Sequence, residues 1–169
     1  GLLRPFDAFD LVSSLKQNLS IPIHMQTHAT TGMSAATNMK AIEAGIDNID
    51  TSVSSLSMTY GHSATETMNA IFEGHERYIN LDMEALEECS IYFKDIREKY
   101  SEFEGDMKGV DTTMLVKQVP GGMISNLETQ LKSNRQEDKI DQVKNEIPEV
   151  RKDFGYPPLV TPASQIVGA

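Results

Sequence analysis

Residues 23–53 read IHMQTHATTGMSAATNMKAIEAGIDNIDTSV, and the order of their side chains sets the architecture expected for the chain. Residues 21–28 and residues 46–53 alternate polar and apolar side chains, which is typical of β-strands. Between them, residues 33–44 predict a helix that ends at Gly45. A strand, a helix and a second strand of these lengths are typical of βα units, which build a parallel sheet.

The rest of the chain adds one further predicted strand and several helices. The strand is expected at residues 114–119, and residues 156–165 read as a proline-rich loop. The helices are expected at residues 7–19, 65–72, 82–103, 125–134 and 139–154, the last interrupted by Pro148. A complete (β/α)8 barrel needs about 250 residues. The α/β pattern with two or three strands therefore predicts the C-terminal part of a TIM-type barrel, with earlier strands upstream.

The longest predicted helix, residues 82–103, carries apolar residues at steps of three and four along its whole length. Cys89, the single cysteine of the chain, lies on this stripe. We therefore expect it to be a buried small apolar residue rather than a reactive thiol. One cysteine also excludes an internal disulfide framework.

Composition limits the function classes. The 169 residues are 39% apolar and carry a net charge of −10, which argues against nucleic acid or an anionic membrane surface as the main partner. No apolar run reaches the roughly 18 residues of a membrane span, and residues 1–10 contain no export signal. We therefore expect a cytoplasmic protein. The terminal residues suggest a piece of a longer polypeptide.

Three polar residues at alternate positions, His24, Gln26 and His28, share one face of the first predicted strand. Imidazole nitrogens suit Zn, Mn or Co, and the Gln26 amide oxygen is a poorer ligand. This spacing indicates part of a metal site. The alternative is an inward-facing polar strand whose side chains satisfy one another.

Two loops offer further candidate groups. In residues 119–126, VPGGMISN, the glycines allow close approach of a ligand and Ser125 offers a hydroxyl. The alternative is a glycine-rich turn in which Ser125 caps a helix. Residues 51–66, rich in Ser and Thr, are a binding loop for a polar substrate or a solvated loop. His62 within them is expected to be a surface histidine.

Five long stretches together resemble the biotin-dependent carboxyltransferase family. This family includes the oxaloacetate decarboxylase α subunit, the carboxyltransferase domain of pyruvate carboxylase and the pyruvate-acting subunit of transcarboxylase. The stretches are GLLRPFDAFDLVSSLK, PIHMQTHATTGMSAATNMKAIEAGIDNIDTSVSSLS, YGHSATETM, QVPGGMISNLETQL and EIPEVRKDFGYPPLVTPASQIVG. The resemblance implies a barrel part at residues 1–120 and the start of a post-barrel helical domain at residues 121–169.

The resemblance also implies site residues and cofactors. The family holds a divalent metal through an Asp, a carbamylated Lys and an H-x-H pair; His28 matches the second histidine of that pair. Gln26 stands at the position of the first, which leaves its ligand role in question. Ser125 matches the hydroxyl residue that shuttles a proton between biotin and the pyruvate enolate. Biotin itself arrives on a separate carrier segment.

The function implied is carboxyl transfer between oxaloacetate or pyruvate and carrier-bound biotin through a metal-stabilised enolate. The implied partners are these keto acids, a biotin carrier domain, membrane decarboxylase subunits in one branch, and further copies of the full-length protein in a homo-oligomer. We expect the 169 residues alone to be inactive. Two alternatives stay open: a non-catalytic homologue whose metal site Gln26 impairs, and a related metal-dependent aldolase-type barrel.

Overall fold

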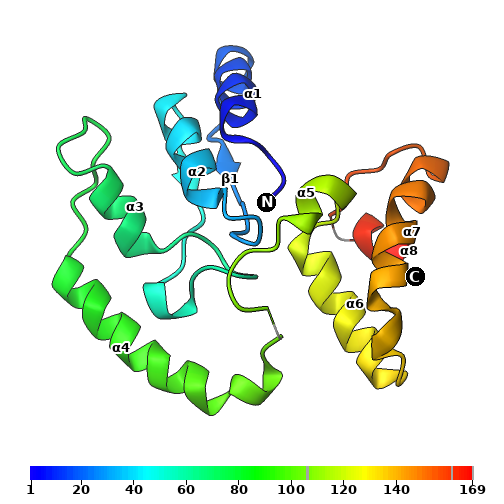
Figure 1. The fold of residues 1–169 in the computed structure, drawn as a ribbon. Helices are drawn as coiled ribbons and strands as arrows, with labels where there is room; N and C mark the ends of the chain where they lie inside the picture. The colour runs from blue at the N-terminus through cyan, green and yellow to red at the C-terminus, as the bar shows by residue number, and fades with distance from the viewer. Residues whose placement is uncertain (106, 161, 169) are drawn as a thin grey trace. The chain divides into compact units, whose positions relative to one another are not determined.

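The computed structural model describes residues 1–105, 107–160 and 162–168, and at positions 113, 117, 121 and 125 it describes the backbone only. The chain forms two compact units. The first contains Gly1 and Leu3–Val110, and the second contains Leu2 and the residues from Asp111 onward. The α-helices of both units and strand β1 are labelled in Figure 1.

The first unit is built on a parallel pair of strands, β1 (His24–Met25) and β2 (Asn48–Ile49). His24 pairs with Asn48 and Met25 with Ile49. Helix α2 (Ser34–Glu43) connects the strands, so the predicted βα order is confirmed. Both strands are shorter than predicted, because among the described residues each pairs with the other on one edge alone.

A small apolar core holds the helices against this sheet. Val12 of α1 (Pro5–Asn18), Ala41 of α2 and Ile46 are buried together. Met25 and Ile49 pack against them from the strands, and α1 and α2 lie side by side (Figure 1). Since side chains alternate along a strand, the neighbours of Met25 point away from the helices.

The rest of the first unit follows β2. It comprises a short 3-10 turn η1 (Ser54–Leu56), α3 (Thr65–Ile71), the long helix α4 (Met83–Lys99) and a second 3-10 turn η2 (Ser101–Phe103). Asp82 caps α4, because its side chain accepts a hydrogen bond from the Ala85 amide at 3.0 Å.

Polar side chains of helix α4 form hydrogen bonds to η1. Ser90 Oγ lies 2.7 Å from Ser54 Oγ, and Arg97 Nη1 donates to the Ser55 carbonyl at 2.7 Å. No residue of α4 is buried by the described part of the chain. Cys89 is exposed, so the prediction of a buried cysteine is wrong.

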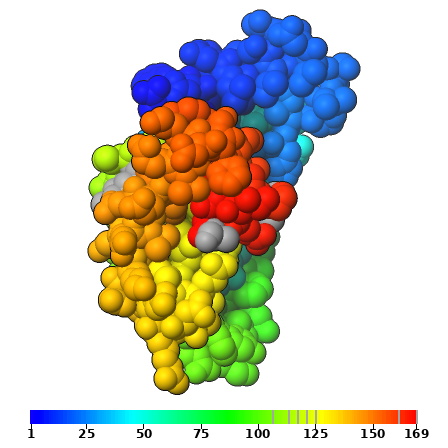
Figure 2. Space-filling view, turned by 90° about the vertical axis from the view of Figure 1, so that its right-hand side faces the viewer, coloured from blue at the N-terminus to red at the C-terminus, as the bar shows by residue number. Residues whose placement is uncertain are grey.

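The second unit is helical. Its helices are α5 (Thr113–Lys117), α6 (Gly121–Ser133), α7 (Ile140–Asp153) and α8 (Ala163–Gly168), with the 3-10 turn η3 (Glu137–Lys139) before α7. In the space-filling view α8 (red) lies against α7 (orange) (Figure 2). Their shared core consists of Met114, Val119, Met123, Ile124, Leu127, Ile147, Leu159 and Val167.

Several predictions for the second unit are wrong. Residues 114–119 do not form a strand: they lie largely in α5, which ends at Gln118 in the left-handed conformation with φ of 57°. The Gln118 side chain donates to the Leu115 carbonyl at 2.7 Å and closes that turn. A run of Met, Leu, Val and Lys is compatible with a helix, and burial of Met114 on a helical core decides between the two.

Two further differences concern glycine and proline. The PGG segment is the start of α6, with Pro120 preceding the first turn, and is not a glycine-rich turn. Helix α7 continues through Pro148 rather than being interrupted there. Ile147 beside it is only 2% exposed, so packing into the core offsets the missing backbone hydrogen bond.

The architecture agrees with part of the predicted fold. The described residues contain one two-stranded parallel sheet flanked by helices, followed by a helical unit. A TIM-type barrel and a domain boundary at residue 120 stay predictions. Among the described helices, none combines the length and the apolar character that crossing a membrane would require.

Candidate functional site

The candidate site lies just beyond the carboxyl end of β1, where His28 meets the loop that follows β2. His28 is half-buried, and its Nδ1 lies 2.6 Å from the carbonyl oxygen of Tyr60. A carbonyl oxygen only accepts, so the hydrogen bond requires the proton on Nδ1. Nε2 then keeps its lone pair. This is the arrangement found in metal-binding histidines, which commonly donate their second ring nitrogen to a carbonyl or carboxylate.

His62 lies beside His28 and repeats its arrangement. The two imidazole rings are stacked, with centroids 4.8 Å apart and planes inclined by 25°. His62 Nδ1 lies 3.1 Å from the carbonyl oxygen of Thr27. His62 is half-buried here, so the prediction of a surface histidine is wrong. The two histidines lie 34 positions apart in the sequence, and no local pattern predicts their contact, because the course of the loop brings the two rings together.

The loop reaches this position through a tight turn. Met58 and Thr59 both have positive φ, of 65° and 49°. The turn is closed by two backbone hydrogen bonds, from Met58 N to His62 O at 2.8 Å and from Gly61 N to Met58 O at 2.7 Å. The Ala29 amide then donates to the Gly61 carbonyl at 2.8 Å, which joins the loop to the segment after β1.

Buried hydroxyl groups lie in the same part of the chain. Ser34 Oγ and Ser63 Oγ are 2.7 Å apart, and both residues are at most 2% exposed. Thr30 is also buried, and its hydroxyl has no hydrogen-bond partner among the described residues. These side chains fix the position of α2 relative to the loop, because a buried hydroxyl pair is costly to separate.

The three polar residues of the first predicted strand do not converge on one point. His24 Nε2 pairs with Asp50 Oδ1 at 2.6 Å, and both side chains are partly exposed. Gln26 is exposed and makes no hydrogen bond to any described residue. His28 instead turns toward Tyr60. His24 and Asp50 satisfy each other, as the alternative interpretation of this face expects, whereas Gln26 does not take part.

Burial also affects the protonation of the His28 imidazole. Burial lowers the pKa of the His28 imidazole, the Tyr60 carbonyl opposes this shift, and proximity to the His62 ring lowers the pKa further. A lowered pKa keeps the ring unprotonated on Nε2 at neutral pH. His28 therefore fits the role of one metal ligand.

The described residues do not complete a metal site. A divalent ion bound by nitrogen and oxygen ligands needs three or four protein groups. Among the described side chains there is no cluster of three or more His, Cys, Asp or Glu that could hold an ion. Any further ligands would have to come from outside the described residues.

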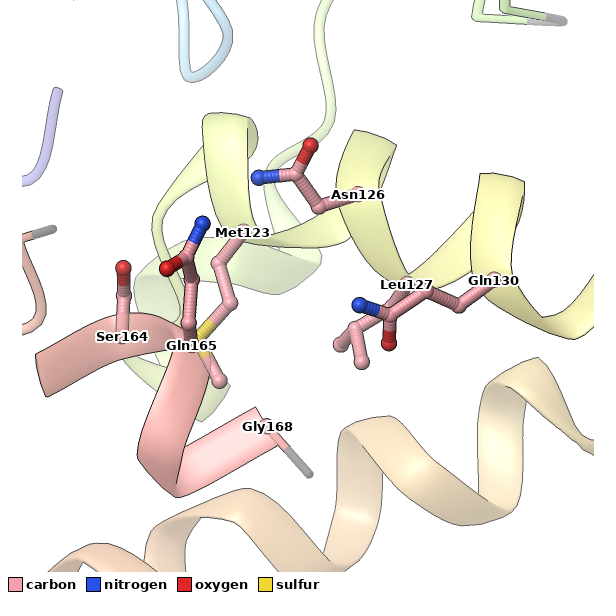
Figure 3. Close-up of a pocket in the computed structure, with 7 residues that line it drawn as sticks. All are labelled: Met123, Asn126, Leu127, Gln130, Ser164, Gln165 and Gly168. Atoms are coloured by element: carbon pink, nitrogen blue, oxygen red, sulfur yellow. The ribbon is translucent and has the colours of Figure 1, made fainter. Parts of the chain in front are cut away.

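The second predicted chemical group, Ser125, follows the first turn of α6, and its side chain lies outside the described part of the chain. A small hollow lies close by in the sequence, between α6 and α8 (Figure 3). It is lined by Met123, Asn126, Leu127, Gln130, Ser164, Gln165 and Gly168. Its empty volume of about 240 Å³ includes space open to solvent. It is therefore a shallow surface hollow rather than an enclosed ligand pocket.

The Ser/Thr-rich loop uses several of its own polar groups internally. Ser54 N donates to Glu66 Oε1 at 2.9 Å, and Thr65 Oγ1 donates to Thr51 Oγ1 at 2.8 Å. Ser57 Oγ donates to the Ser54 carbonyl at 2.8 Å. The Ser54–Glu66 bond joins η1 to α3, and the two hydroxyl bonds fix the residues beside them, so a structural role accounts for this part of the loop.

Comparisons with known proteins cover the whole chain. Residues 1–92 match the HMGL-like family, and residues 114–169 match a family described as a conserved carboxylase domain. The 5S subunit of methylmalonyl-CoA carboxyltransferase from Propionibacterium freudenreichii is 46% identical over 99% of this chain and 34% of its own length. A pyruvate carboxylase subunit from Methanocaldococcus jannaschii is 46% identical over 99% of this chain and 30% of its own length.

A solved structure has the same fold. The carboxyl transferase domain of Rhizobium etli pyruvate carboxylase, determined with pyruvate and biocytin, matches with a TM-score of 0.93 and 34% identity. The match covers 99% of this chain and 28% of that chain. The chain thus spans about a third of the length of the relatives that it matches, and those relatives are enzymes. The chain belongs to the biotin-dependent carboxyltransferase family, with an HMGL-like segment followed by a conserved carboxylase segment.

Proposed function

We propose that this chain is part of a biotin-dependent carboxyltransferase that moves a carboxyl group between oxaloacetate or pyruvate and biotin on a separate carrier segment. The observation that carries the proposal is the state of His28. Its Nδ1 is tied to the Tyr60 carbonyl at the carboxyl end of β1, and its Nε2 keeps the lone pair. The carboxyl ends of strands are where barrel enzymes assemble their active sites.

The residues of this chain have distinct parts in the proposed reaction. His28 would hold a divalent ion together with ligands from outside the described residues. When bound, such an ion would supply Lewis-acid stabilisation of the negative charge that develops on the keto acid. Ser125 would accept and return one proton between biotin and the enolate, since a hydroxyl both donates and accepts.

Gln26 decides between this proposal and its main alternative. At this position the side-chain amide of Gln26 replaces the first imidazole of the family's H-x-H pair. The Gln26 side chain is exposed and forms no hydrogen bond to a described residue. A free amide can turn toward an ion as a weak ligand. In the alternative, the site no longer retains its metal and the protein is a non-catalytic homologue.

Metal content and activity of the full-length parent test the proposal. We expect the purified parent to retain one divalent ion per active site and to decarboxylate oxaloacetate, and Gln26→His to bind the ion more tightly. His28→Ala should lose both metal and activity. A parent that binds no metal and gains none through Gln26→His would contradict the proposal. Ser125→Ala should keep the metal and lose carboxyl transfer, which separates the two roles.

A further inference from the structure

The segment after β1 and the loop after β2 are joined through three consecutive residues on each side. The Thr27 carbonyl accepts a hydrogen bond from His62 Nδ1, and His28 Nδ1 donates a hydrogen bond to the Tyr60 carbonyl. Ala29 donates to the Gly61 carbonyl. The bonds run in both directions, so neither segment can shift along the other without breaking at least one of them. His62 supplies the only side-chain group that the loop contributes to these three bonds.

The stacked rings add an orientation constraint that backbone hydrogen bonds cannot give. An imidazole can rotate about its terminal torsion angle, because that torsion is broad and roughly two-fold. Rotation by half a turn would exchange Nδ1 with a ring carbon and remove the bond to Tyr60. The His62 ring, 4.8 Å away and inclined by 25°, occupies the space beside one face of His28 and limits that rotation.

The tautomers of both rings follow from their partners. His62 faces a carbonyl oxygen through Nδ1, so this nitrogen must carry the proton, as it does in His28. Neither ring can then donate through Nε2 while it remains neutral. In both rings the hydrogen bond therefore assigns a proton to Nδ1 and leaves Nε2 outside these contacts.

From these contacts we propose that His62 is a positioning residue for His28. It holds the loop at Thr27 and restricts the His28 ring, so that Nδ1 stays on the Tyr60 carbonyl and Nε2 stays available as a ligand. The inference about the ligand rests on the proposed function, but the orientation of the His28 ring can be measured without any metal. Outer-shell partners of metal ligands typically contribute 10- to 100-fold in metal affinity.

The first test uses the metal-free, full-length parent labelled with ¹⁵N-histidine. Nitrogen shifts report which ring nitrogen of His28 carries the proton. We expect Nδ1 in the unaltered protein and a mixture of both tautomers in His62→Ala. His75→Ala is the matched control, since His75 is an exposed histidine elsewhere in the same unit, and it should leave the His28 signals unchanged. An unchanged His28 tautomer in His62→Ala would overturn the proposal.

The second test follows Co²⁺ binding by visible absorption, which responds to ligand geometry, and by the rate of release to a chelator. Co²⁺ should bind about 10- to 100-fold more weakly to His62→Ala than to the unaltered parent. His62→Phe keeps a ring against His28 and guards against misfolding; it should lose affinity to a smaller extent. If both variants bind Co²⁺ like the parent, the positioning role is refuted. If the parent itself binds none, the proposed function fails while the tautomer test still decides the role of His62.

Discussion

Gly61 is the middle one of the three loop residues that contact the His28 segment, and replacing it with alanine should loosen that contact. A Cβ at this position would lie 2.8 Å from the Leu56 carbonyl oxygen and 3.1 Å from the Met58 carbonyl oxygen. Both obstacles are backbone atoms, and the Met58 carbonyl already accepts from the Gly61 amide. The added methyl group cannot be accommodated by turning a side chain, so the backbone of the turn must move.

The cost follows from these distances. Inserting a methyl group into a space that lacks room for it costs about 1–3 kcal/mol. Gly→Ala also reduces the conformational entropy of the unfolded chain, which stabilises the folded state by about 0.4–1 kcal/mol. The two ranges combine to a net destabilisation of the local structure between about 0 and 2.6 kcal/mol, and their midpoints give about 1.3 kcal/mol, which corresponds to roughly a tenfold change in the opening equilibrium.

Hydrogen exchange of the full-length parent, read by mass spectrometry, measures this effect locally. Peptides that contain the amides of Ala29, Met58 and Gly61 should exchange faster in Gly61→Ala by the factor given above. Gly122→Ala is the matched control. A Cβ at residue 122 meets no atom within 4 Å, and this helical glycine should gain about 0.5–1 kcal/mol as alanine. Equal exchange in Gly61→Ala and the unaltered protein would refute the reasoning.

Three other predictions concern residues away from the loop. Asn38 is fully buried, and neither polar atom of its side-chain amide has a hydrogen-bond partner among the described residues. Asn38→Leu should therefore raise the free energy of unfolding by about 1–3 kcal/mol, measured by thermal unfolding. A decrease in that free energy would indicate a partner outside the described residues. The bond from Arg97 lowers the pKa of Glu104 below its ordinary value of 4.5, so this pair stabilises the fold above pH 4.5 and ceases to do so as the pH falls through the lowered pKa. Glu104→Gln should flatten that pH dependence in acid unfolding, by no more than about 1 kcal/mol because the pair is partly exposed. Cys89 should react with a maleimide in the native protein as an ordinary exposed thiol; reaction only after unfolding would contradict its exposed position.

The wrong predictions have one cause in common: the sequence pattern of a segment does not specify which other parts of the protein pack against that segment. The stripe on residues 82–103 predicts burial, yet the described part of the chain buries no residue of α4, and Cys89 is exposed. The run at residues 114–119 suits a strand or a helix, and contact with the core of the helical unit selects the helix. Pro148 is tolerated inside α7 because its neighbour Ile147 is packed into that core.

The sequence by itself determined the βα order of residues 23–53 and the family, and it predicts His28 as the surer ligand candidate. These rest on side-chain periodicity and on long motifs, both of which are local properties of the chain. Only the tertiary structure decided how His28 is held and that His62 is its neighbour. Those facts depend on a turn at Met58 and Thr59 that returns the loop to the end of β1, and contacts between residues 34 positions apart follow from backbone geometry that no local pattern encodes.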